Sequence, residues 1–62
     1  MYRIFNTERN QYYSRKWSNP TFTKLGQIFQ TKELAQKCIN RIISYQGKYE
    51  DYSAILIIEE FK

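Results

Sequence analysis

TKELAQKCINRIISYQ, residues 31–46, decides the fold, because its apolar side chains recur at the spacing of an α-helix. They fall on one half of the cylinder, and polar or charged side chains occupy the other half. Thr31 belongs to the residue types that cap helix N-termini, and Gly47 can adopt the left-handed conformation that ends a helix. The stretch therefore predicts a helix over residues 32–46 with one buried face. That face consists of Leu34, Ala35, Cys38, Ile39, Ile42 and Ile43.

The segments on either side of this helix have the composition of β-strands. Downstream, SAILIIEEF (53–61) contains the apolar run Ile55–Ile58, which predicts a strand shielded on both faces or central in its sheet. Upstream, YRIFNT (2–7) and QYYSRKW (11–17) are two β-prone runs joined by Glu8, Arg9 and Asn10, which predicts a hairpin with a tight polar turn.

A third short strand is predicted between the hairpin and the helix. Asn19-Pro20 marks a break, and Gly26 precedes QIFQ (27–30), which leads directly into Thr31. The expected order is β-β-β-α-β. The sequence thus predicts an α+β fold, a single domain over residues 1–62 with one helix packed on a small antiparallel or mixed sheet.

The length and the cysteine count limit how such a domain is stabilised. A chain of 62 residues has a small core, and with one cysteine and no histidine it has neither an internal disulfide nor the usual zinc ligands. Packing or self-association must contribute instead, so a homodimer or higher homo-oligomer is expected. The longest apolar run, residues 54–58, is far shorter than the roughly 20 residues of a membrane span, and no signal peptide is visible. We expect no membrane association and a cytoplasmic location.

The residue types argue against catalysis. Without histidine, Ser-His and Cys-His nucleophile pairs are excluded, and no glycine-rich phosphate loop or metal cluster is visible. Glu59 and Glu60 are adjacent in a strand and therefore point to opposite faces. Cys38 is expected to be a small buried hydrophobe. The sequence predicts a protein that is not an enzyme and has no cofactor or metal.

The heptapeptide QYYSRKW mixes rings and cations on both faces of its strand. Residues 13, 15 and 17 share one face, and residues 12, 14 and 16 share the other. In one interpretation Tyr13 and Trp17 join the core while Tyr12 pairs across strands with Tyr2 or Ile4.

In a second interpretation the outward rings and nearby cations form an exposed platform. Its candidate binding residues are Arg3, Tyr12, Arg15, Lys16, Trp17, Phe22 and Lys24. Bases stack on such rings and phosphates pair with such cations, but Tyr, Trp and Arg are also the types that dominate protein interfaces. The formal net charge is only +4, and the last residues are acidic. We therefore predict a protein partner, bound through the hairpin and the loop 17–25. A nucleic-acid-binding module using the same residues is the alternative, and a structural or small-ligand-binding oligomer is a weaker one.

The N-terminal half also carries a resemblance. YRIFNTERNQYYS, then Trp17, then GQIFQTKELAQKCINRI after a spacer, resembles small uncharacterised accessory proteins of tailed bacteriophages. The matching positions are Tyr2, Tyr13, Trp17, Gly26, Ile28 and Phe29. The resemblance implies an accessory phage protein that acts on a host or phage protein in the host cytoplasm, and it implies no catalytic residue.

Overall fold

The amphipathic stretch forms the helix predicted for it. The computed structural model describes residues 1–16, 20–45 and 52–61, and helix α1 spans Lys32–Tyr45. The Leu34 N–H donates a 3.2 Å hydrogen bond to Thr31 Oγ1, which confirms Thr31 as the N-cap. Gly47, the predicted C-terminal stop, lies outside the described residues.

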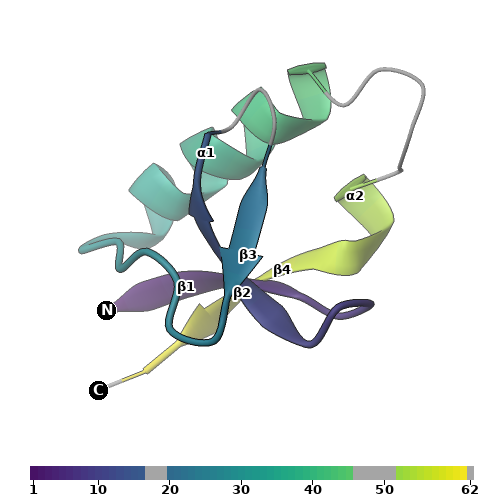
Figure 1. The fold of residues 1–62 in the computed structure, drawn as a ribbon. Coiled ribbons are helices and arrows are strands. Elements are labelled where there is room, and N and C mark those ends of the chain that lie inside the picture. Colours follow the sequence, from purple (N-terminus) through teal and green to yellow (C-terminus); the bar gives the residue numbers. More distant parts are fainter. Residues whose placement is uncertain (17–19, 46–51, 62) are drawn as a thin grey trace.

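Four antiparallel strands form one sheet beneath α1 (Figure 1). They are β1 (Tyr2–Asn6), β2 (Gln11–Arg15), β3 (Thr21–Thr23) and β4 (Leu56–Glu60), in the spatial order β3-β2-β1-β4. A single helical turn, α2 (Tyr52–Ile55), leads into β4. The predicted α+β class and the order β-β-β-α-β are confirmed, with α1 packed on the sheet. No helix in the described parts of the chain has the length and apolar character needed to cross a membrane.

The predicted β1–β2 hairpin closes through a polar turn. Asn6 Oδ1 accepts hydrogen bonds from the Glu8 and Arg9 amides at 3.0 and 2.9 Å. Asn10, with φ of 58°, takes the left-handed conformation that asparagine tolerates. The two strands pair through Phe5↔Tyr12 and Asn6↔Gln11 only, so they separate beyond this end.

The prediction of a third strand at residues 27–30 is wrong. The third strand is β3, and the segment Gln27–Phe29 enters the gap where β1 and β2 separate. The Gln27 amide donates to the Tyr13 carbonyl, whereas Phe29 exchanges two hydrogen bonds with Tyr2. Because Gln27 bonds to β2 and Phe29 bonds to β1, the segment forms one bridge and no ladder.

The prediction of an internal C-terminal strand is also wrong. The run at residues 54–58 begins within α2, and β4 starts only at Leu56. Among the described strands β4 pairs with β1 alone, in the register Ile4↔Ile58, and it lies at an edge of the sheet. One face of β4 contributes Leu56 to the core, while Ile57 on the other face is 47% exposed.

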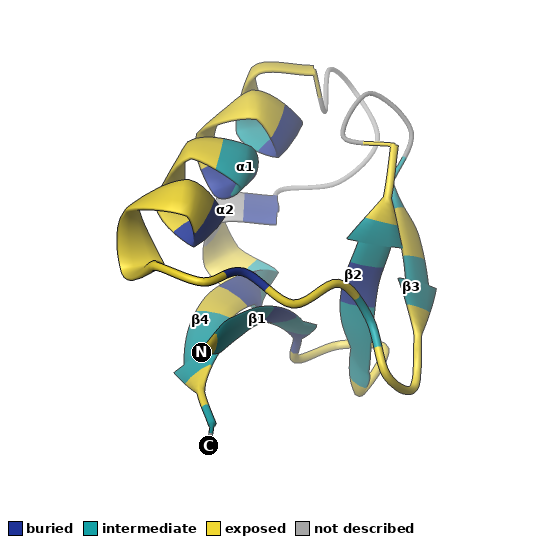
Figure 2. Ribbon diagram, turned by 90° about the vertical axis from the view of Figure 1, so that its left-hand side faces the viewer, coloured by how far each residue is buried: buried dark blue, intermediate teal, exposed yellow. Residues whose placement is uncertain are grey.

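The core lies between α1 and the sheet, as the dark positions in Figure 2 show. Rings supply much of it, since Tyr13 stacks on Phe29 at 6.5 Å between centroids. Cys38 and Ile43 are partly buried beside it, but Leu34 is 48% exposed, so the buried face of α1 is narrower than predicted. The buried hydrophobic residues are Ile4, Tyr13, Phe29, Ala35, Ile39, Ile42, Tyr52 and Leu56.

Candidate functional site

One face of the sheet is turned away from α1, and strand alternation determines which side chains it presents. On β1, Ile4 and Asn6 are buried toward the helix, so Arg3 and Phe5 point to the opposite face. The register places Tyr12 and Ile57 on either side of Phe5, and Glu59 beside Arg3. Phe61 lies two residues after Glu59, so its side chain points to the same face of the sheet. We call this surface the open face; it consists of Arg3, Phe5, Tyr12, Ile57, Glu59 and Phe61.

Arg3 is held between two aromatic rings on the open face. Its guanidinium carbon lies 4.0 Å from the Tyr12 ring centroid and 4.3 Å from that of Phe61. Nη1 donates a 3.3 Å hydrogen bond to the Leu25 carbonyl, and Nε is buried without a partner among the described residues. Two cation–π contacts and a backbone bond fix this side chain, so its rotamer freedom is already lost before any partner binds.

Tyr12 connects the same cluster to the acidic C-terminal strand. Its hydroxyl donates a 2.6 Å hydrogen bond to Glu59 Oε1, and its ring lies 5.1 Å from the Phe5 ring, between centroids. The hydrogen bond to Glu59, with some burial, raises the pKa of the Tyr12 hydroxyl above its usual 10.0, while the Arg3 charge opposes the shift. The open face therefore carries a cation, a carboxylate and a neutral phenol in fixed positions.

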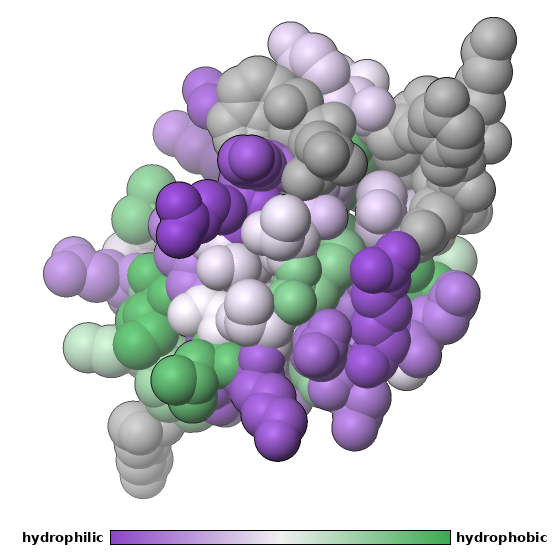
Figure 3. Space-filling view, viewed as in Figure 1, coloured by the Kyte–Doolittle hydropathy of each residue, from purple (hydrophilic) through white to green (hydrophobic). Residues whose placement is uncertain are grey.

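Exposed apolar side chains surround this cluster. Met1 shares backbone hydrogen bonds with Phe61 and is 58% exposed, and Leu25, whose carbonyl binds Arg3, is 77% exposed. Ile28 precedes the buried Phe29 and is 54% exposed. Figure 3 shows hydrophobic surface gathered on the side of the molecule where the N-terminus lies. Together with Ile57, these residues form an apolar rim around a fixed polar centre.

The loop that carries Leu25 approaches the sheet closely at Gly26. A Cβ at this position would lie 2.3 Å from Tyr12 Cβ and 2.8 Å from the Tyr13 carbonyl oxygen, and φ is +69°. Only glycine satisfies both requirements. Gly26 thereby places the Leu25 carbonyl on Arg3.

The structure brings together only part of the predicted platform. Arg3 and Tyr12 are in contact, although Tyr12 pairs across strands with Phe5 rather than with the predicted Tyr2 or Ile4. Phe22, also predicted in the platform, lies apart from the Arg3 cluster. Because it lies opposite Tyr13 in the β2–β3 ladder, its partly buried ring lies 6.4 Å from that of Tyr13 and 6.1 Å from that of Tyr52, between centroids. The Arg9 guanidinium carbon lies 5.5 Å from the Phe22 ring centroid.

The predicted cations are dispersed rather than gathered. Arg15 pairs with Thr21, so Arg15 and Lys16 lie at one end of the β2–β3 ladder and Lys24 lies at the other. All three are exposed, and in the described parts of the chain none of their side chains forms a cation–π contact or a hydrogen bond with the rings around Arg3. Trp17 lies outside the described residues.

Four members of the open face were not predicted as binding residues: Phe5, Ile57, Glu59 and Phe61. Alternation along the last strand places Ile57, Glu59 and Phe61 on one face, and this signal is present in the sequence. Their position beside Arg3 depends on the pairing of β4 with β1, which the sequence pattern does not specify.

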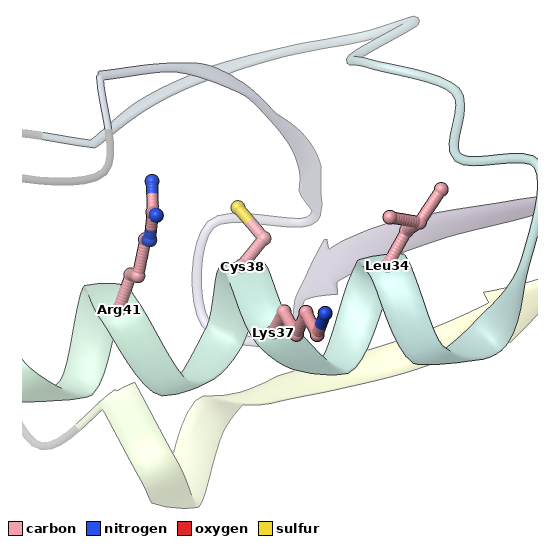
Figure 4. Close-up of a pocket in the computed structure, with 4 residues that line it drawn as sticks. All are labelled: Leu34, Lys37, Cys38 and Arg41. Carbon is pink, nitrogen blue, oxygen red and sulfur yellow. The ribbon is translucent and has the colours of Figure 1, made fainter.

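A separate hollow of about 250 Å³ lies along α1 and is lined by Leu34, Lys37, Cys38 and Arg41 (Figure 4). Burial raises the pKa of the Cys38 thiol, against the opposing effects of a hydrogen bond with Tyr13 and the Arg41 charge. The thiol therefore stays protonated near neutral pH and is a poor nucleophile. Cys38 is partly buried beside the core, close to the small hydrophobe predicted.

Comparisons with family models, with curated proteins and with solved structures gave no match for this chain.

Proposed function

We propose that this protein acts without catalysis, by binding another protein through the open face and its apolar rim. The observation that carries the proposal is the fixed Arg3 between Tyr12 and Phe61, surrounded by exposed Leu25, Ile28 and Ile57. Arg and Tyr side chains ringed by apolar contacts have the composition of interface hot spots. Because Arg3 is already ordered, its binding to a partner costs less conformational entropy.

Three features of the open face favour a protein over a nucleic acid. Arg3 lies over the Tyr12 ring and the Phe5 ring lies beside it, so little of this ring is free for a base to stack on. The Glu59 carboxylate on the same face repels phosphate. Among the remaining predicted cations, Arg15 and Lys16 lie at the end of the β2–β3 ladder opposite Lys24, so the cations do not form one row along a backbone.

The proposed absence of catalysis rests on how the carboxylates and the thiol are placed. Glu59 accepts the Tyr12 hydroxyl hydrogen, and Glu60 points to the other face of β4, so the two do not share a site. Burial raises the pKa of the Cys38 thiol, which keeps it protonated near neutral pH. Together with the resemblance to phage accessory proteins, this favours a partner from the host or the phage.

The test compares two leucine substitutions of the same kind. Leu25→Asp adds a charge to the rim, whereas Leu34→Asp adds the same charge to an exposed position on α1. Proteins retained from a bacterial lysate, with and without nuclease, are identified by mass spectrometry, and the affinity of the recovered partner is then measured by calorimetry. We expect Leu25→Asp to weaken binding about tenfold or more and Leu34→Asp to leave it unchanged.

Two results would overturn the proposal. One is equal loss of binding in both folded variants, which would place the contact elsewhere. The other is retention that disappears on nuclease treatment, together with oligonucleotide affinity that falls linearly on a log–log plot against salt. That result would establish the nucleic-acid alternative.

A further inference from the structure

The two edges of the sheet are protected very differently. The β3 edge is three residues long and is bounded by Pro20 and Lys24, both of which discourage pairing with another strand. The β4 edge begins with Leu56, Ile57 and Ile58, and its five residues include no proline, lysine or arginine. Natural monomers seldom leave an apolar edge strand without such protection against pairing.

The hydrogen bonds of β4 show which of its backbone groups are free. Thr7 donates to the Ile55 carbonyl and Phe61 donates to the Met1 carbonyl, both at 2.9 Å. Since successive residues alternate in direction, Ile57 and Glu59 also face β1, and the Leu56 carbonyl and the N–H and C=O groups of Ile58 and Glu60 face outward. The Leu56 N–H closes the last turn of α2. In the described parts of the chain no hydrogen bond outside the helices and strands reaches the outward groups.

We propose that the β4 edge pairs antiparallel with β4 of a second copy, with Ile57 opposite its own counterpart on a two-fold axis. In this register the Leu56 carbonyl accepts a hydrogen bond from the Ile58 N–H of the other copy, and the reverse. Ile57, exposed at 47%, packs on the second Ile57 as a close non-hydrogen-bonded pair. The two sheets become one, with both α1 helices on the same side.

The charge pattern selects this register and this partner. A shift of two residues toward the C-terminus would set Glu59 opposite Glu59, with like charges facing each other. The proposed register instead opposes apolar residues to apolar ones and keeps Glu59 and Glu60 of each copy at the outer ends. The segment is therefore complementary to itself, as an isologous two-fold contact requires.

The first test uses sedimentation equilibrium at high micromolar concentration on two matched lysine substitutions. Ile57→Lys adds an edge lysine, and Leu34→Lys adds a lysine at a similarly exposed apolar position on α1. We expect the unaltered chain and Leu34→Lys to dimerise equally, and Ile57→Lys to weaken the dimer about tenfold or more. A monomeric unaltered chain, or equal weakening by both lysines, would overturn the proposal.

A second test does not depend on side-chain packing. In a chemically synthesised chain, N-methylation of Ile58 removes an outward donor, while the bonds from β4 to β1 are retained. A folded monomer is the expected product, with folding checked by circular dichroism. A dimer of unchanged affinity would show that the interface lies elsewhere, whatever Ile57→Lys does.

Discussion

The Tyr12 hydroxyl donates a 2.6 Å hydrogen bond to Glu59 Oε1, which links β2 to β4 across the intervening β1. This contact places the acidic end of the chain against its basic start. Because Arg3 of β1 lies over the Tyr12 ring, one side chain from each of three strands meets on the open face. Their relative positions are fixed by the strand register rather than by any single loop.

The two-ring contact of Arg3 depends on its planar guanidinium. Arg3→Lys keeps the charge but loses planar stacking and the fork geometry that reaches the Leu25 carbonyl. We expect the free energy of unfolding to fall by about 1 kcal/mol, as measured by urea denaturation. Arg15→Lys is the control, because the Arg15 side chain is exposed, and should change stability by less than about 0.5 kcal/mol. Equal effects would mean that the ring contacts contribute nothing.

Gly26 is expected to tolerate no side chain. Gly26→Ala places a methyl group within 2.3 Å of Tyr12 Cβ at a φ of +69°, so both the clash and the strain must be relieved by moving the loop. We expect a loss of about 2 kcal/mol or more, which unfolds a large fraction of so small a domain. Gln27→Ala, an exposed neighbour, serves as the control. The two variants are compared by thermal melting. Similar melting midpoints for Gly26→Ala and Gln27→Ala would contradict this account.

The sequence predicts the elements whose signals are local. The helix at 32–45 follows from apolar periodicity and Thr31, and the first hairpin follows from the polar turn at Glu8–Asn10. The errors concern non-local pairing. The run at 27–30 has the composition of a strand, yet the space between β1 and β2 admits only one bridge.

The same limit applies to the binding residues. An isoleucine-rich run predicts a central strand, but β4 lies at an edge with Ile57 exposed, which alternation alone does not reveal. Arg3 and Tyr12 were predicted because rings and cations cluster near the N-terminus. Their partners Glu59 and Phe61 are far away in sequence, and only the β1–β4 register brings them together. The face of the sheet on which Phe22 lies likewise depends on its pairing with Tyr13, which the sequence pattern does not specify.

Asn6 stabilises the hairpin turn through its side-chain carbonyl. Asn6→Ala removes the acceptor for the Glu8 and Arg9 amides, each bond being worth about 1 kcal/mol, so a loss of about 2 kcal/mol is expected. The buried Nδ2 has no hydrogen-bond partner among the described residues, so its removal adds no penalty. Asn40→Ala is the matched control, since the Asn40 side chain accepts an exposed hydrogen bond from Gln36, and it should change stability by less than about 0.5 kcal/mol. The free energies of unfolding are measured by urea denaturation. Equal losses in Asn6→Ala and Asn40→Ala would contradict the role of Asn6.

Tyr13 should make the fold sensitive to alkali. Burial, and then the hydrogen bond with Cys38, raises the pKa of its hydroxyl well above the ordinary value of 10.0. Above pH 10.0 an unfolded tyrosine loses its proton while the folded Tyr13 keeps it, so the unfolded state gains stability and the free energy of unfolding falls as pH rises. Below that pH the contribution is fully present.

Tyr13→Phe keeps the ring in the core and removes the titrating group. We expect the variant to lose less stability than the unaltered chain when urea denaturation is compared below and above pH 10.0. The Tyr13→Phe variant still loses some stability at alkaline pH, because the raised pKa of the Tyr12 hydroxyl acts in the same direction. An alkaline loss in Tyr13→Phe as steep as that in the unaltered chain would show that the buried hydroxyl of Tyr13 is not its source.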